Sequence, residues 1–446
     1  HMKILIAGDG ETGSHLAEML SVENQDVVLM GADRERLQEL DATSNFLTFQ
    51  GNPVSASALA GCGVADTDLF VAVTPDDNAN IVACELAKGL GASKCVARVD
   101  NPEFSDPRIG QLLRRLGIDM TIYPERMAAE AILHFIRHNW ASDWFRLLDG
   151  ELLVVGVRVH KEGTLANHRL RDFIQSPRFC HVAAIKRGDK VIIPRGDDCI
   201  LPGDTLYIST LPENASRIHT LCGGSSVKAG RIMITGAGRV TENVLKLLGG
   251  GISVTVIDPD RERCRDMASR FPDAVVVNTR SSDVVAMKEE GIEQCDMFLA
   301  LTGKSEANIV ACMVAREHGV RKTLARIEEF QYVQEAESLD IDKIVNKKQL
   351  NAGMVMNFLL GSEMATTQCL ATDKAEVTTI VAREDSRIVS RPIGELSLPR
   401  ELTIAGLVRD GKGIMVEGNT CVRPGDHVVV FFLTGSLSKV KRLFRQ

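Results

Sequence analysis

The residues best suited to chemistry in this chain form two glycine-rich turns that could hold a diphosphate. The first turn contains Gly8, Gly10 and Gly13 and directly follows the apolar run at residues 4–7. Glycines at this spacing let the backbone approach a diphosphate, which free N–H groups and the positive end of the next helix stabilise. The motif gains weight because it follows a predicted strand and opens a predicted helix. A strand-to-helix turn that binds nothing is the alternative.

The same turn returns in the second half of the chain at Gly236 and Gly238, with Thr241 in place of the third glycine. The segment 80–84 returns at 308–312, and both repeats are 228 residues apart. A repeat of this length duplicates a whole domain, because solenoid units span only about 20–50 residues. The sequence therefore predicts two nucleotide-type sites per chain.

Two further matched pairs follow predicted strands. Thr74 and Thr302 end the fourth strand of each half, at the carboxyl edge where doubly wound sheets bind ligands. Arg98 and Arg326 end the fifth strand, where an arginine facing phosphates would form a bidentate clamp. An ordinary salt bridge to a helix carboxylate is the other interpretation of these arginines.

The two halves differ at the end of their second strand. Asp258 ends that strand in the second half, where a carboxylate could bind the ribose hydroxyls of a nucleotide. Gly31 is aligned with Asp258, so the first half is expected to lack this carboxylate and to favour ATP or ADP over NAD(H). Thr241 is expected to prevent the closest packing of helix on strand in the second half.

The elements that position these residues are typical of an α/β chain. Continuous apolar strands alternate with helical stretches, which indicates a parallel, doubly wound sheet in each half. In the first half the predicted strands lie at 3–7, 27–30, 46–49, 69–73 and 95–99. From Glu151 the pattern changes to alternating apolar and polar residues with Gly-Asp turns, which predicts a smaller α+β domain. Its Pro-Gly-Asp turn at 202–204 returns at 424–426.

The predicted fold class is thus α/β, with two Rossmann-like doubly wound parallel-sheet domains, each followed by a small α+β domain. The residues 223–226 read as a flexible linker between the halves. The expected segments are nucleotide-binding domains at 1–118 and 223–345, crossover or interface helices at 119–150 and 346–375, and small domains at 151–222 and 376–446.

Composition excludes several classes of function. A net charge of −7 without a long basic run argues against a nucleic-acid partner. No pair of the eleven cysteines has Cys-x-x-Cys spacing, so neither a disulfide framework nor a zinc or other metal site is predicted. No signal segment or membrane span is visible, so we expect a soluble, cytoplasmic protein that reaches a membrane only through a partner.

An NAD(P)-dependent oxidoreductase is the main rival function. Hydride transfer needs an acid-base group beside the nicotinamide, but the ten histidines are scattered and none recurs in the other half. We therefore predict no catalytic residues and no enzymatic turnover. Cys84 and Cys312 recur, and core packing is favoured over redox sensing. Trp140 and Trp144 indicate either an interface with a neighbouring unit or burial within one half.

Taken together, these features resemble the TrkA family, the regulatory proteins of Trk potassium-uptake systems, which contain two tandem RCK (regulator of potassium conductance) units. The resemblance spans Lys3 to Phe444 and rests on the glycine turns, the segments 74–80 and 97–99, and the small-domain segments 188–194 and 201–207.

The resemblance implies a cytoplasmic gating subunit that takes NAD(H) or ATP/ADP as regulatory ligands. It also implies a homotetramer or dimer of dimers, held at the inner face of the plasma membrane by a potassium-conducting subunit of the TrkH type. Carried over by position, the first site comprises Gly8, Asp9, Gly10, Glu11, Thr12, Gly13, Asn52, Thr74 and Arg98. The second site comprises Gly236, Ala237, Gly238, Arg239, Val240, Asp258, Thr302 and Arg326.

Overall fold

The computed structural model of the chain describes residues 2–22, 25–173, 178–188, 190–329, 331–360, 364–369 and 375–444. They fall into two units, one of His1–Pro124 with Lys348–Gln446 and the other of Glu125–Lys347. Each unit therefore contains the larger domain of one half of the sequence and the small domain of the other half.

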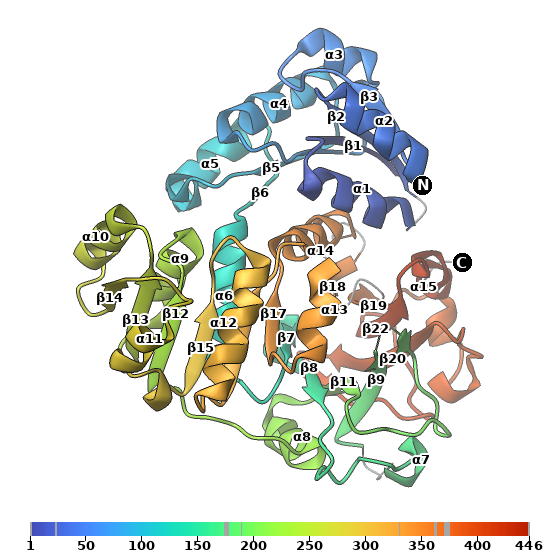
Figure 1. Cartoon of the computed structure of the whole chain (residues 1–446). Coiled ribbons are helices and arrows are strands. Elements are labelled where there is room, and N and C mark those ends of the chain that lie inside the picture. The colour runs from blue at the N-terminus through green and yellow to red at the C-terminus, as the bar shows by residue number, and fades with distance from the viewer. Residues whose placement is uncertain are drawn as a thin grey trace. The chain divides into compact units, whose positions relative to one another are not determined.

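The first half opens with a six-stranded parallel sheet in the order β3-β2-β1-β4-β5-β6, with helices on both faces (Figure 1). Its strands are β1 (Lys3–Ala7), β2 (Asp26–Gly31), β3 (Leu47–Gln50), β4 (Leu69–Ala72), β5 (Lys94–Arg98) and β6 (Met120–Ile122). Its helices are α1 (Glu11–Val22), α2 (Arg34–Thr43), α3 (Ala56–Gly61), α4 (Asp77–Leu90) and α5 (Pro107–Arg115), with 3-10 turns η1 (Val64–Asp66) and η2 (Pro102–Ser105). The strand order reverses between β1 and β4, which is the point where doubly wound sheets bind ligands.

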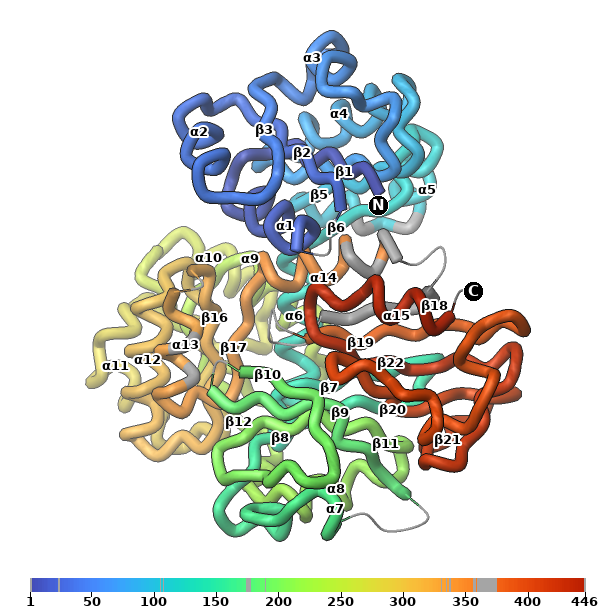
Figure 2. The backbone as a smooth tube through the Cα atoms, turned by 90° about the vertical axis from the view of Figure 1, so that its right-hand side faces the viewer, coloured from blue at the N-terminus to red at the C-terminus, as the bar shows by residue number. Residues whose placement is uncertain are grey.

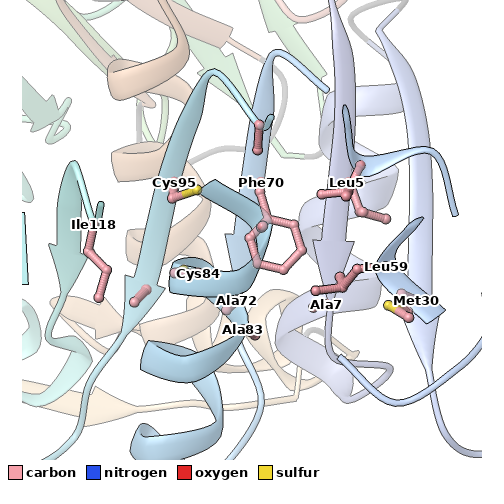
Figure 3. Packing of buried hydrophobic residues seen from close by; sticks show 14 of the residues in the cluster. Leu5, Ala7, Met30, Leu59, Phe70, Ala72, Ala83, Cys84, Cys95 and Ile118 are labelled. Atoms are coloured by element: carbon pink, nitrogen blue, oxygen red, sulfur yellow. The ribbon is translucent and has the colours of Figure 1, made fainter. Parts of the chain in front are cut away.

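These elements form for local reasons that the sequence displays. The strand β4 is buried along its whole length because both faces of the sheet are covered, so it reads as a continuous apolar run. The helix α4 begins after Asp76, whose carboxylate accepts from the amides of Asn78 and Ala79 at 2.8 and 3.2 Å. Figure 3 shows Ala83 and Cys84 of α4 packed on the strands that carry Phe70 and Cys95. The core therefore fixes α4 against the strands whose ends carry the candidate site.

The second half repeats this domain, with the strand order β14-β13-β12-β15-β16-β17. Its strands are β12 (Arg231–Thr235), β13 (Ser253–Asp258), β14 (Val275–Asn278), β15 (Met297–Ala300), β16 (Lys322–Arg326) and β17 (Lys343–Val345). Its helices are α9 (Arg239–Leu248), α10 (Arg261–Arg270), α11 (Val284–Glu289), α12 (Ser305–Glu317) and α13 (Gln331–Ser338), with the turn η5 (Ile292–Gln294). The predicted duplication of a doubly wound parallel sheet is confirmed.

Each small domain is built on a five-stranded antiparallel sheet, and Figure 2 shows the two sheets in green and in orange to red. The first has the order β10-β9-β11-β8-β7 and comprises β7 (Asp143–Leu147), β8 (Leu152–Arg158), β9 (Cys180–Arg187), β10 (Lys190–Ile192) and β11 (Thr205–Thr210), with α7 (Leu170–Phe173), α8 (Ala215–Cys222) and turns η3 (Leu148–Gly150) and η4 (Pro212–Asn214). The second has the order β18-β19-β22-β20-β21 and comprises β18 (Met364–Cys369), β19 (Ala375–Val381), β20 (Leu402–Arg409), β21 (Lys412–Ile414) and β22 (His427–Leu433), with α15 (Leu437–Phe444) and turns η6 (Arg387–Val389) and η7 (Ile393–Glu395). The predicted small α+β domains are confirmed, and read in opposite directions the two sheets have the same topology.

The segments between the larger and smaller domains each supply one helix and one strand. The helices are α6 (Pro124–Arg137) and α14 (Lys347–Leu360), and the strands β7 and β18 pair with β8 and β19. The segments expected to hold crossover helices thus also contribute the edge strands of the small-domain sheets.

The structure shows where the two recurring cysteines and the two tryptophans lie. Cys84 and Cys312 are buried, with thiols 3.3 and 3.4 Å from the carbonyls of Val96 and Leu324, and burial raises the pKa of both thiols. Trp140 lies edge-on to Trp144 with ring centroids 5.7 Å apart, and both indoles pack on the core of the first small domain. Core packing accounts for the cysteines. The tryptophans are half-buried against the small-domain core of their own half, and a role at an interface with a neighbouring unit stays a prediction.

Candidate functional site

The glycines of the first turn have different physical roles. Gly8 has a φ of +132°, and a Cβ there would lie 3.1 Å from the amide nitrogen of Thr74. A Cβ on Gly13 would lie 1.8 Å from the carbonyl oxygen of Gly8, so only glycine lets α1 approach β1 this closely. A Cβ on Gly10 would meet nothing within 4 Å. Gly8 and Gly13 therefore serve the packing of the turn, whereas Gly10 leaves its backbone open to a ligand.

The second turn keeps the roles of Gly8 and Gly10 at Gly236 and Gly238, and it has Thr241 at the position of Gly13. Gly236 has a φ of +101° and a Cβ there would lie 2.9 Å from the amide nitrogen of Thr302, whereas a Cβ on Gly238 would meet nothing within 4 Å. Thr241 is fully buried, and its hydroxyl donates a hydrogen bond to the carbonyl of Gly236. This bond joins α9 to the glycine turn at the position where Gly13 packs against the carbonyl of Gly8 in the first half.

The remaining turn residues give the two halves opposite charges. Asp9 and Thr12 are half-buried and Glu11 is exposed in the first half, whereas Ala237 and Val240 are buried and Arg239 is exposed in the second. The carboxylate of Glu11 forms an ion pair with Lys348. Two acids thus lie in the first turn where the second turn has an alanine and an arginine, so the second turn is the more favourable place for a diphosphate.

Asp258 is held at the carboxyl edge of the second sheet by backbone amides. Its side chain is buried, and its two oxygens accept hydrogen bonds from the amides of Ala237 and Asp260, both at 2.8 Å. The carboxylate therefore bridges the glycine turn and the start of α10, where a nucleotide ribose binds in doubly wound folds.

The first half also has a carboxylate near this place, although it comes from another part of the chain. Gly31 lies at the end of β2, and a Cβ there would lie 2.2 Å from Oδ2 of Asp9. That oxygen accepts a hydrogen bond from the amide of Asp33 at 2.8 Å. The expectation that the first half lacks a carboxylate here is wrong, because the side chain of the turn residue Asp9 covers the strand end that Gly31 leaves bare.

A buried asparagine in each half joins the strand ends that carry the threonine and the arginine. In the second half, Oδ1 of Asn308 accepts from the amide and the hydroxyl of Thr302 at 3.1 and 2.6 Å. Its Nδ2 donates to the carbonyls of Thr302 and Arg326 at 2.9 and 2.7 Å. We refer to this arrangement as the asparagine clamp. All four polar valences of the amide are used, so the clamp holds the ends of β15 and β16 at a fixed separation.

The first half contains the same clamp. Oδ1 of Asn80 accepts from the amide and the hydroxyl of Thr74 at 2.9 and 2.6 Å, and its Nδ2 donates to the carbonyls of Thr74 and Arg98, both at 2.9 Å. Neither Asn80 nor Asn308 was among the site residues predicted from sequence. Their recurrence at the start of the repeated five-residue segment was the signal that could have identified them.

Both strand-end arginines pair with an acidic residue two positions further along the chain. Nε and Nη2 of Arg98 donate to the two oxygens of Asp100 at 3.2 and 2.8 Å. Nε of Arg326 donates to Oε1 of Glu328, and that oxygen lies 3.8 Å from Nζ of Lys347. A guanidinium carries five N–H donors, so these pairs orient each arginine and leave donors for a phosphate. The salt-bridge interpretation is correct as to pairing, although the partner follows the strand directly and does not lie in a helix.

Asn52 is the last of the predicted site residues. It is exposed just after β3, and its Oδ1 accepts from the amide of Val54 at 3.1 Å. The preceding Gly51 donates from its amide to the carbonyl of Gly31 at 2.8 Å. The carboxyl edge of the first sheet therefore brings together the glycine turn, the end of β2, Asn52 and the asparagine clamp.

Two features of the described residues narrow the possible chemistry further. Among these residues no cluster of histidine, cysteine, aspartate and glutamate has a metal-binding arrangement. The helices in the described ranges also include none with the length and hydrophobicity needed to cross a bilayer.

Comparison with known proteins gives a consistent result over the whole chain. The sequence model of the TrkA-N domain matches residues 4–124 and 232–347, and that of the TrkA-C domain matches residues 154–223 and 377–445. The chain is similar to the Trk system potassium uptake protein TrkA homolog 1 of Methanosarcina mazei, with 30% identity over 456 residues and all of both chains covered. It is equally similar to TrkA of Haemophilus influenzae, with 30% identity over 453 residues that cover 100% of this chain and 99% of the relative.

Solved structures share the fold at lower identity. The RCK domain of GsuK matches with a TM-score of 0.63 and 17% identity, covering 100% of this chain and 95% of its own. The GsuK channel bound to NAD matches with a TM-score of 0.63 and 17% identity, covering 100% of this chain and 79% of its own. The arrangement of two doubly wound domains and two small domains is therefore that of tandem RCK units.

Proposed function

The chain belongs to the TrkA family of Trk system potassium uptake proteins, and from this premise we propose that it is a nucleotide-binding regulatory subunit that controls potassium flux through a membrane partner. The observation that carries the proposal is the repeated carboxyl-edge geometry. Each half has a glycine turn with one open glycine, a carboxylate beside the second strand, and an asparagine clamp between the threonine and the arginine.

The proposed ligands are adenine nucleotides, NAD(H) or ATP/ADP, bound once in each half. In the second half the open backbone at Gly238 and the exposed Arg239 favour a diphosphate, Asp258 offers acceptors to the ribose, and Arg326 reaches phosphate. The first half offers the same open backbone at Gly10, and Thr74, Arg98 and Asn52 lie at the same carboxyl edge of its sheet. The ligands act by binding, and we propose no turnover.

Regulation requires that a nucleotide bind two conformations of the assembly with different affinity. Allosteric coupling is typically about 1–3 kcal/mol per site, whereas moving an equilibrium from 1:99 to 99:1 takes about 5.5 kcal/mol. One site is therefore too weak to act as a switch, but several sites in one closed assembly are sufficient. The two sites in each chain and a homotetramer or dimer of dimers meet this need, and such a ring closes by rotation.

The proposed partner is a potassium-conducting membrane subunit of the TrkH type, which would hold this protein at the inner face of the plasma membrane. The relatives named Trk system potassium uptake protein TrkA support this assignment. Light scattering at micromolar concentration tests the assembly, since a strict monomer would contradict the ring.

Reconstituted flux tests the function. Potassium flux through a TrkH-type subunit in vesicles is expected to depend on adding this protein and to change with nucleotide. Asp258→Ala and Arg326→Ala should weaken the nucleotide response and leave the assembly intact, whereas Asp273→Ala and Arg265→Ala, which alter exposed residues, serve as matched controls. The proposal would be contradicted if adding the protein, with its assembly verified, left potassium flux unchanged in the presence of each of NAD, NADH, ATP and ADP.

A binding experiment separates regulation from catalysis. Thermal unfolding of the full chain is measured with NAD, NADH, ATP and ADP, because a ligand at 100 times its Kd stabilises by about 2.7 kcal/mol. A shift with at least one nucleotide is expected, without NADH oxidation in the presence of simple carbonyl compounds. Steady oxidation would favour the oxidoreductase alternative.

A further inference from the structure

We propose that the Asp9 carboxylate binds the ribose hydroxyls of an adenine nucleotide in the first half, in the role that the strand-end Asp258 has in the second half. This inference rests on the proposed nucleotide binding and assigns the ribose contact of one of its sites. It makes Asp9 a specificity-determining side chain in a turn whose contacts to phosphates otherwise come from the backbone.

The first argument is a reciprocal exchange between aligned positions. The first half has Asp9 in the turn and Gly31 at the end of β2, whereas the second half has Ala237 in the turn and Asp258 at the end of β13. Each half thus has one carboxylate and one small residue at the same two positions, with their places exchanged.

The second argument is that both carboxylates accept a hydrogen bond from the equivalent amide. Oδ2 of Asp9 accepts from the amide of Asp33 at 2.8 Å, and Oδ1 of Asp258 accepts from the amide of Asp260 at 2.8 Å. Asp33 and Asp260 are the N-caps of α2 and α10, with φ and ψ of −83° and 105° in one case and −84° and 113° in the other. Because the local backbone is the same, a carboxylate oxygen in each half lies at the same place relative to the following helix.

The third argument is steric. A Cβ on Gly31 would lie 2.2 Å from Oδ2 and 2.4 Å from Cβ of Asp9, so a side chain at position 31 and the observed Asp9 conformation exclude each other. Only a glycine at position 31 therefore lets the Asp9 carboxylate lie against the end of β2. A strand-end acid added to the existing Asp9 would bring two carboxylates into contact.

Accessibility favours a ligand-binding role for Asp9. Asp9 is half-buried, so its carboxylate is partly accessible to a ligand at the sheet edge. A carboxylate has about four acceptor positions, and the amide of Asp33 uses one of them. Vicinal ribose hydroxyls are donors that match the rest, whereas a 2′-phosphate would meet a like charge. The predicted ligand is thus a nucleotide with free 2′ and 3′ hydroxyls.

The test measures how strongly the first site distinguishes ribose hydroxyls. Isothermal titration of the full chain carrying Asp258→Ala compares ADP with 2′,3′-dideoxy-ADP. A hydrogen bond to a charged group corresponds to a preference of roughly tenfold to a hundredfold for ADP. Adding Asp9→Ala is expected to bring this ratio close to one. Asp9→Asn keeps an oxygen for the Asp33 amide, and hence the loop, and is expected to reduce the ratio to an intermediate value.

A double variant that moves the carboxylate from the turn to the strand end tests whether the preference for ADP can be restored. Asp9→Ala with Gly31→Asp gives the first half the arrangement of the second, and it is expected to restore the preference for ADP. Thermal unfolding of each variant without nucleotide verifies that it folds.

The outcomes separate this inference from the proposed function. If Asp9→Ala weakens ADP and dideoxy-ADP equally, Asp9 supports only the loop and the inference is overturned. If the wild-type chain binds ADP but the chain carrying Asp258→Ala does not, the inference fails while nucleotide binding by the second half stands. If the wild-type chain binds no adenine nucleotide, the proposed function fails and this inference fails with it.

Discussion

Replacing Asn308 by aspartate is expected to destabilise the second larger domain and its candidate site together. The substitution keeps the shape of the side chain, and a carboxylate still accepts from the amide and hydroxyl of Thr302. It cannot donate, however, so the bonds of 2.9 and 2.7 Å to the carbonyls of Thr302 and Arg326 are lost.

The magnitude follows from these two bonds. Each buried acceptor left without a partner costs about 1–3 kcal/mol, so the pair costs about 2–6 kcal/mol before the cost of burying a charge is added. For a domain of this size a loss of 3 kcal/mol lowers the Tm by roughly 10 °C. Because the clamp holds the strand ends that carry Thr302 and Arg326, nucleotide affinity of the second half should fall as well.

The assay is differential scanning calorimetry of the full chain, with nucleotide titration of the same samples. Position 308 is buried, and burial disfavours the charged form of a carboxyl, so the folded-state pKa of Asp at this position should lie above its unfolded value. The difference from wild type should then shrink as pH falls, because the protonated carboxyl regains one donor, and grow as pH rises through the folded pKa.

The chain offers a replicate and a control for this experiment. Asn80→Asp removes two bonds of 2.9 Å in the first half and should have a similar effect there. Asn78→Asp alters an exposed residue in the first turn of α4, where an acid is tolerated by the helix dipole. A wild-type Tm and wild-type nucleotide affinity for Asn308→Asp at neutral pH would refute the reasoning about the clamp.

Three further predictions concern the glycine turn, a half-buried ion-pair network and a half-buried histidine. Gly13→Ala should destabilise the first larger domain by about 3 kcal/mol in denaturant unfolding, because the new Cβ would lie 1.8 Å from the carbonyl oxygen of Gly8. Gly10→Ala should leave the stability unchanged and weaken nucleotide binding. Lys347→Met should cost about 3–5 kcal/mol, since Nζ lies 3.2 Å from Glu125 and 3.8 Å from Glu328, and adding Glu125→Gln should recover part of the loss. Burial lowers the pKa of His181 to about 4, and the charges of Arg178 and Arg195 contribute to this shift. Between this value and the ordinary pKa of about 6.5, the unfolded state therefore binds a proton that the folded state does not. Stability should be complete above that pH and fall by up to about 1.4 kcal/mol per pH unit towards pH 4, and a wild-type pH slope in His181→Gln would contradict this assignment.

Much of the fold was readable from local sequence because its signals are local. The strand expected at 69–73 is β4 (Leu69–Ala72), and the one expected at 95–99 is β5 (Lys94–Arg98), since both are continuous apolar runs buried on two faces. The glycine turns were recognisable because their spacing is set within six residues. The repeat then extended each assignment from the first half to the second.

The asparagine clamp was not readable in the same way. Asn80 and Asn308 lie in the first turns of α4 and α12, where a polar residue is ordinarily exposed to solvent. Their burial follows from the position of the neighbouring strand end, 18 residues further along the chain, whose carbonyl accepts from the side-chain amide. No local pattern specifies that distance.

By itself the sequence determined the duplication, the fold class, the family and the positions of both glycine turns, because these depend on residue identity and on spacing along the chain. Only the tertiary structure decided where the charges lie around those turns. Sequence alignment puts Gly31 opposite Asp258 and so implies a missing carboxylate, but the parallel pairing of β1 with β2 brings the Asp9 side chain over that glycine. The place of a functional group in space is set by which strand ends meet at the sheet edge, and that proximity joins residues that are distant in the sequence.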